Sequence, residues 1–118
     1  MQGSERTPSN AAVRTALRRC LAACDRALSR YVSEFELSTD NALVQDVVSA
    51  MAAVATAIDY LDRDAERRRH ALRLVIDVCH RAARTCRHHG LDDDLLACAA
   101  ACENAAMYAE LTLGSTAA

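Results

Sequence analysis

The chain has 118 residues, enough for one compact domain but too few for two. Its 14 basic residues are all arginines, interspersed with 16 acidic residues, and this balance argues against nucleic acid as the main partner. Hydrophobic residues make up 52% of the chain, but alanine is the commonest of them and aromatic residues are few, so the core must be thin. With three glycines, one proline and hardly any alternation of β-branched with polar residues, the sequence predicts an all-α protein.

The first half of the chain predicts a polar tail and two helices. Residues 1–8 lack periodicity, so we expect a loose tail before a helical bundle that spans residues 9–113. Thr7 or Ser9 can cap the first helix, with Pro8 in its first turn. Its apolar positions, in steps of three and four, are Val13, Leu17, Cys20, Cys24, Ala27 and Tyr31. The second helix has the cysteine-free stripe Leu43, Val47, Ala50, Val54, Ala57 and Leu61.

The second half predicts two further helices of the same kind. The break before the third helix is weakly marked, with Asp62 and Asp64 as plausible caps. We expect a tight turn there, because a separate third helix returns its apolar stripe to the same core. That stripe is Leu72, Val75, Cys79, Ala82 and Cys86. The stripe of the fourth helix is Leu91, Leu95, Cys98, Cys102, Ala105 and Ala109.

The connection between the third and fourth helices is the most clearly marked. Gly90 is expected to close the third helix in the left-handed conformation. Asp92 then caps the fourth helix, and Leu91 is expected to pack onto Leu96. Residues 114–118 are predicted to form a loose tail. The whole pattern predicts an antiparallel up-down-up-down four-helix bundle.

All six cysteines fall on the inward stripes that such a bundle buries. A buried cysteine can be a small hydrophobic filler, and this alternative stays open. However, Cys20 and Cys24 lie one turn apart on one face, as do Cys98 and Cys102, which suits a shared metal better than a strained intrahelical disulfide. If the first and third helices run parallel, Cys79 lies level with the first pair and with Cys102. Cys86 and Cys98 then lie nearer Gly90, and the six thiols form one compact site for a few ions.

The ligand type selects the metal. Thiolates favour Cu(I), Zn(II) or iron–sulfur clusters. Zinc usually takes four ligands from short CxxC hairpins, which are absent from this sequence, and the spacing typical of cluster binding is absent too. Because Cu(I) accepts two or three ligands, we expect Cu(I).

The sequence also predicts a compartment. The N-terminus has no apolar signal core, and no apolar stretch approaches the ~20 uncharged residues of a membrane-spanning helix. We therefore expect a cytoplasmic protein with no membrane partner, in a compartment where thiols stay reduced.

The pattern VCHRAARTCRHHGLDDDLLACAAACENAA, preceded by CLAAC on the first helix, resembles the cysteine-rich four-helix-bundle copper storage proteins over roughly residues 17–110. The resemblance implies core thiol ligands at Cys20, Cys24, Cys79, Cys86, Cys98 and Cys102, a histidine at the bundle mouth at His88 or His89, and a homo-oligomer, typically a tetramer. Where that family has further cysteines, this chain has Ala27, Leu43, Val47, Ala50, Val54, Ala82 and Ala105. The second helix therefore supplies no thiolate, which argues against bulk storage.

Three hypotheses follow. The first is a cytosolic Cu(I)-binding protein that sequesters copper or delivers it, with a copper chaperone or a copper-requiring client as partner. The second is a copper-dependent enzyme on the same bundle, with a small thiolate site acting on an organic substrate. The third is a metal-free helical protein that mediates association.

Overall fold

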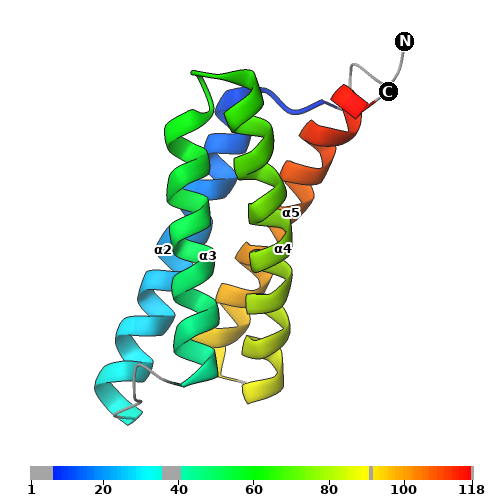
Figure 1. Cartoon of the computed structure of the whole chain (residues 1–118). Helices are drawn as coiled ribbons and strands as arrows, with labels where there is room; N and C mark the ends of the chain where they lie inside the picture. Colours follow the sequence, from blue (N-terminus) through cyan, green and yellow to red (C-terminus); the bar gives the residue numbers. More distant parts are fainter. Residues whose placement is uncertain (1–6, 36–40, 91, 118) are drawn as a thin grey trace.

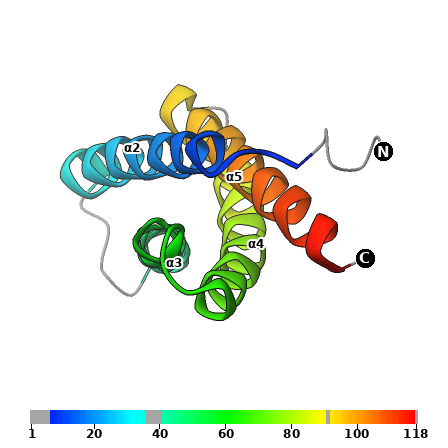
Figure 2. The ribbon, with the colours of Figure 1, turned by 90° about the horizontal axis from the view of Figure 1, so that it is seen from above.

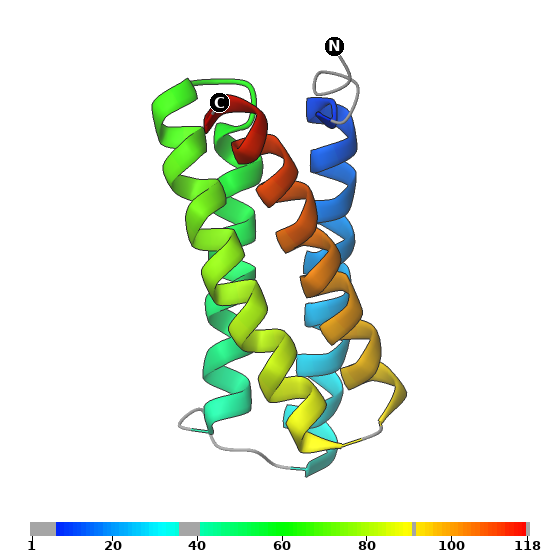
Figure 3. The same ribbon diagram turned by 90° about the vertical axis from the view of Figure 1, so that its right-hand side faces the viewer.

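The computed structural model describes residues 7–35, 41–90 and 92–117, and in these ranges the chain forms helices and no strand. The helices are α2 (Asn10–Phe35), α3 (Ala42–Tyr60), α4 (Ala65–His89) and α5 (Asp93–Ala117). Successive helices pack side by side, and α5 also packs against α2 and so closes the bundle. The helices run alternately up and down (Figures 1 and 3). Viewed from above, α2 lies across from α4 (Figure 2). The predicted all-α four-helix bundle is confirmed.

The first two helices begin at side-chain caps. The Ser9 hydroxyl oxygen accepts a hydrogen bond from the Ala12 N–H at 3.1 Å, so Ser9 caps α2. Pro8 therefore precedes the helix, and its predicted place in the first turn is wrong. Asn41 caps α3 by accepting from the Leu43 N–H at 2.8 Å.

A tight turn separates α3 from α4, as predicted. Asp64 caps α4 by accepting from the N–H groups of Glu66 and Arg67. Asp62, the other predicted cap, instead pairs with Arg14 and accepts from the Asn10 amide. These contacts hold the start of α2 against the turn.

The α4–α5 connection departs from the prediction at Gly90. This residue has φ 142° and ψ −164°, so it does not adopt the left-handed helical conformation. That region of backbone space is almost confined to glycine, which explains the residue type. Asp92 caps α5 by accepting from the N–H groups of Asp94 and Leu95, as predicted. Leu91 lies outside the described residues, so its predicted place on the stripe and its predicted packing on Leu96 stay predictions.

The α5 helix continues past Leu113 through Gly114 to Ala117. A loose tail is predicted from residue 114, so the described helix overlaps that segment by several residues. The predicted limits of the bundle stay a prediction.

The core is thin, because leucines and valines are its largest fully buried side chains. Every predicted inward position in the described ranges is buried, except Tyr31, which is partly buried and packs against the core. No polar or charged side chain in the described part of the chain is buried. The six cysteines are all fully buried and none is in a disulfide.

Charge alternates around the bundle. The α2 and α4 helices carry more arginines than acidic residues, whereas α3 and α5 carry acidic residues and no arginine. Each helix therefore lies beside helices of opposite charge and across from one of like charge. The ion pairs Arg87–Glu103, between α4 and α5, and Arg30–Asp94, between α2 and α5, show this complementarity. The pattern favours this order of neighbours over one that places like charges side by side.

The α3 helix is the one helix among the described residues that is long and apolar enough to cross a membrane. Seven of its residues are buried, and they face the other helices of the bundle. A core helix has the same composition, so this property alone is weak support for a membrane span.

Candidate metal centre

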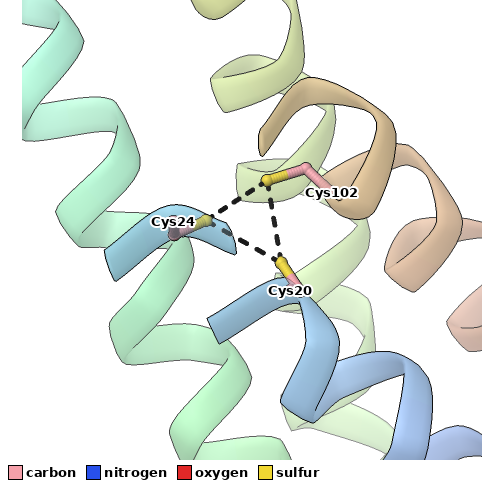
Figure 4. A group of neighbouring side chains, drawn as sticks. All are labelled: Cys20, Cys24 and Cys102. Carbon is pink, nitrogen blue, oxygen red and sulfur yellow. Dashed lines mark hydrogen bonds between the residues drawn. The ribbon is translucent and has the colours of Figure 1, made fainter. Parts of the chain in front are cut away.

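Three thiols meet at the centre of the bundle, and we call them the triad: Cys20 and Cys24 on α2 and Cys102 on α5 (Figure 4). The Cys20 and Cys24 sulfurs are 4.0 Å apart, and the Cys102 sulfur lies 3.7 Å and 3.6 Å from them. Residues four apart on a helix share a face, so α2 presents two thiols together, and the packing of α5 on α2 adds the third.

The triangle has the size of a three-coordinate metal site. A point equidistant from its three sulfurs lies about 2.2 Å from each, close to the roughly 2.3 Å of a zinc–thiolate bond. Among the described residues, no fourth cysteine, histidine, aspartate or glutamate ligand atom lies within 4.8 Å of all three sulfurs. A tetrahedral site would require such a fourth ligand, so the arrangement suits a soft ion that accepts three.

The other three thiols extend this cluster. Cys98, one turn before Cys102 on α5, lies 3.4 Å from the Cys24 sulfur. Cys86 on α4 interacts with Cys98, and Cys79 interacts with Cys102 and Cys20. All six predicted thiol positions therefore join one continuous group of sulfurs, and Cys86 and Cys98 form its part nearest Gly90.

Three of the six thiols hold their protons tightly. Contact with Cys102 is the largest cause that raises the pKa of Cys24 and of Cys79 above the ordinary value of 9.0. Contact with Cys98 does the same for the pKa of Cys86. Burial adds to each shift, because an apolar core disfavours a thiolate. These three residues are therefore neutral thiols at pH 7.

Two thiols of the triad have lowered pKa values. Hydrogen bonds from Cys102, Cys24 and Cys79 stabilise a thiolate at Cys20 and lower its pKa. For Cys102, contact with Cys20 raises the pKa, but contacts with Cys24, Cys79 and Cys98 outweigh it and lower the pKa to about 5. A cation bound within the triad would take over this stabilising role.

Asp46 on α3 lies near the cluster and was not among the predicted site residues. The Thr85 hydroxyl donates to its carboxylate at 2.6 Å, and Thr85 precedes Cys86 on α4. The charge of Asp46 also contributes, less than Cys98 does, to the raised pKa of Cys86. Asp46 stands three residues after the inward Leu43, and this helical spacing was the signal that could have found it.

The predicted histidines lie outside the core. His88 and His89 are exposed in the last turn of α4, and the His89 Nδ1 atom lies 3.2 Å from the Thr85 carbonyl oxygen. Neither belongs to the triad. Their predicted role as ligands stays a prediction.

The sequence profile of one protein family, described as copper storage protein, matches residues 6–111. The chain belongs to the copper storage protein family. Comparison with curated proteins and with solved structures gave no match. Membership in the family supports copper as the metal that the buried thiols bind. The resemblance predicted from the cysteine pattern is thereby confirmed.

Proposed function

We propose that this protein binds Cu(I) through its six core thiols and that it sequesters or delivers a few ions. The triad carries the proposal, because it presents three soft ligands at the size of a three-coordinate site. Cu(I) accepts three thiolates, whereas Zn(II) would lack its fourth ligand there. The proposed ligands are the six cysteines, with the exposed His88 and His89 as further ligands outside the core.

The cluster also limits the proposed capacity. The α3 helix faces the core with leucine, valine and alanine, and it supplies no thiol. Copper ions held by six thiols on three helices must share them, so the amount bound is small. This favours a role in buffering or handing over copper rather than in bulk storage.

The proposed location is the cytoplasm. All six cysteines are free thiols, as expected in a reducing compartment. A site for a soft metal requires cysteines that are not oxidised to disulfides. The proposed partners are copper ions and a copper chaperone or copper-requiring client. We also propose a homo-oligomer, because the cysteine pattern resembles that of the copper storage proteins, for which this assembly is implied.

Anaerobic titration tests the proposal. The purified protein is titrated with Cu(I) against a Cu(I)-specific chelator, and the bound metal is counted by native mass spectrometry. We expect tight binding of a few ions per chain, with no displacement by an excess of Zn(II). Copper that the chelator removes completely at equimolar concentration, or Zn(II) that displaces Cu(I), would contradict the proposal.

A further inference from the structure

The triad lies in a core without compensating charge. Cys20, Cys24 and Cys102 have no solvent exposure, and no polar or charged side chain is buried in the described part of the chain. Burying a net charge in such surroundings is costly unless a partner balances it. The centre that fits the triad best is therefore one whose own charge equals that of the thiolates that hold it.

Three thiolates balance a trivalent centre. A Cu(I) ion held by the triad alone leaves two negative charges uncompensated, and the charge per ion falls when several ions share the six thiols. A trivalent centre bound to the same three sulfurs forms a neutral unit by itself. The triad therefore suits a soft trivalent element by charge as well as by ligand type.

The geometry of the triad also matches three bonds without a fourth. Its sulfurs lie 3.6 to 4.0 Å apart (Figure 4). Among the described residues, no further cysteine, histidine or carboxylate ligand atom lies within 4.8 Å of all three. Arsenic in the +3 state forms three bonds in a pyramid, with a lone electron pair in the fourth direction. A pyramidal centre lies out of the plane of its ligands, so a small inward movement of the sulfurs brings all three within bonding distance.

We propose that the triad captures trivalent arsenic, taken from solution as arsenous acid, and holds it through the sulfurs of Cys20, Cys24 and Cys102. This binding activity is separate from the proposed handling of copper, and it needs only three of the six thiols. Arsenous acid is uncharged at pH 7, so neither the free nor the bound form brings net charge into the apolar core.

The reaction is a condensation without a redox step. Each of the three thiols replaces one hydroxyl group of arsenous acid, so three As–S bonds form, three As–O bonds break and three water molecules leave. Each thiol proton departs with a hydroxyl group as water, and arsenic stays in the +3 state. A sulfur that has already lost its proton forms the same bond, and the proton for its water then comes from the solvent. Binding therefore releases no protons.

The matched variants Cys102→Ala and Cys86→Ala separate the triad from the rest of the thiol group. Both remove one fully buried thiol. Cys102 belongs to the triad, whereas Cys86 lies outside it and interacts with Cys98. Alanine already occupies a buried position one turn from each of them, at Ala105 and Ala82. Circular dichroism checks that both variants keep their helical content.

The first measurement determines what arsenic keeps when it binds. The reduced, metal-free protein is incubated anaerobically with one equivalent of sodium arsenite, and native mass spectrometry gives the mass of the adduct. We expect one arsenic per chain, with three protons lost from the protein and no oxygen retained on arsenic. X-ray absorption at the arsenic edge should show a shell of three sulfur atoms.

The second measurement compares affinities. We expect Cys102→Ala to weaken arsenite binding by about 100-fold or more, and its remaining adduct to keep one hydroxyl group on arsenic. We expect Cys86→Ala to bind arsenite within about threefold of the unmodified protein, with the same gain in mass, although it loses a proposed copper ligand. Between pH 8 and pH 6 the affinity should not fall, in contrast to that of a metal ion that displaces protons.

Oxygen retained on arsenic in the unmodified protein, an unchanged affinity in Cys102→Ala or an equal loss in Cys86→Ala would overturn the inference, as would the absence of binding. Copper takes no part in these measurements. A protein that holds arsenic but no Cu(I) would support the inference and refute the proposed function. A protein that holds Cu(I) but no arsenic would do the reverse, so the two failures are distinguishable.

Discussion

The two halves of the bundle core are built by the same helices but are filled by different kinds of side chain. Toward the α3–α4 turn, leucines and valines fill the space between the helices. From the middle of the bundle to the α4–α5 connection, thiols from three helices take that space, and α3 adds only apolar side chains. The leucine half contains most of the large, fully buried side chains, and the thiol half contains the proposed copper ligands. Substitutions in the leucine half should lower the stability of the fold and leave copper affinity unchanged. Substitutions in the thiol half should lower copper affinity.

The largest expected effect is on copper affinity in the thiol half. Cys24→Ala removes the sulfur that joins the triad to Cys98. We expect it to weaken binding of the first Cu(I) about a thousandfold, or about 4 kcal/mol. Chelator competition measures this, with Cys79→Ala as the control that keeps the triad. Similar losses in both variants would show that the first ion does not bind in the triad.

The next effect is on stability in the leucine half. Leu72 has no solvent exposure, and Leu72→Ala leaves a cavity. We expect the free energy of unfolding of the metal-free protein to fall by about 3 kcal/mol, measured by urea denaturation. The variant should still bind the first Cu(I) with unchanged affinity under conditions where it is folded. A matching loss of copper affinity would show that the two halves are not independent.

Copper itself should stabilise the fold. An ion that binds only the folded chain, buffered at a free concentration about 100 times its dissociation constant, adds about 2.7 kcal/mol to the free energy of unfolding. Thermal or urea unfolding in a Cu(I) buffer checks this. In Cys24→Ala we expect no stabilisation at the same free copper concentration, and an equal gain there would place the ion elsewhere.

Affinity should also depend on pH. Cys24, Cys79 and Cys86 have raised pKa values, so they carry protons at neutral pH, and copper must displace these protons. Lowering the pH therefore weakens binding, by about tenfold per pH unit for each proton released. Competition titrations between pH 6 and pH 8, corrected for protonation of the chelator, measure how steeply the logarithm of copper affinity changes with pH. An affinity independent of pH would mean that the ligands are already deprotonated.

The smallest effect concerns a cap in the leucine half. Asp64→Ala removes the side chain that accepts from two N–H groups at the start of α4. We expect a loss of about 1 kcal/mol of stability and no change in copper binding. The neighbouring Asp62→Ala makes a useful comparison, because Asp62 does not cap α4. A change in copper affinity in Asp64→Ala would show coupling along α4.

Much of this structure could be predicted because a helical stripe is a local property. Apolar residues in steps of three and four identified the inward faces, and the cysteines on them, without knowledge of the partner helices. The caps Asp64 and Asp92 were also local signals. Their side chains bond to N–H groups only two or three residues away.

Features that depend on contacts between helices were harder to predict. The assumption of parallel first and third helices grouped the thiols by level, but the triad depends on how far α5 slides along α2, which no stripe determines. The spacing of Asp46 from Leu43 places it toward the core, but its contact with Thr85 joins two helices and could not be predicted from α3 alone. The conformation predicted for Gly90 was wrong, because this glycine adopts an extended conformation with positive φ and does not close α4 in the left-handed helical conformation.

X-ray absorption spectroscopy of the protein loaded with one equivalent of Cu(I) tests most directly whether three sulfurs meet in a trigonal site. We expect an edge typical of three-coordinate Cu(I) and a shell of three sulfur atoms at about 2.2 Å, consistent with metal–thiolate bonding. A shell containing nitrogen or oxygen, or four sulfur atoms, would contradict the assignment of the first ion to Cys20, Cys24 and Cys102.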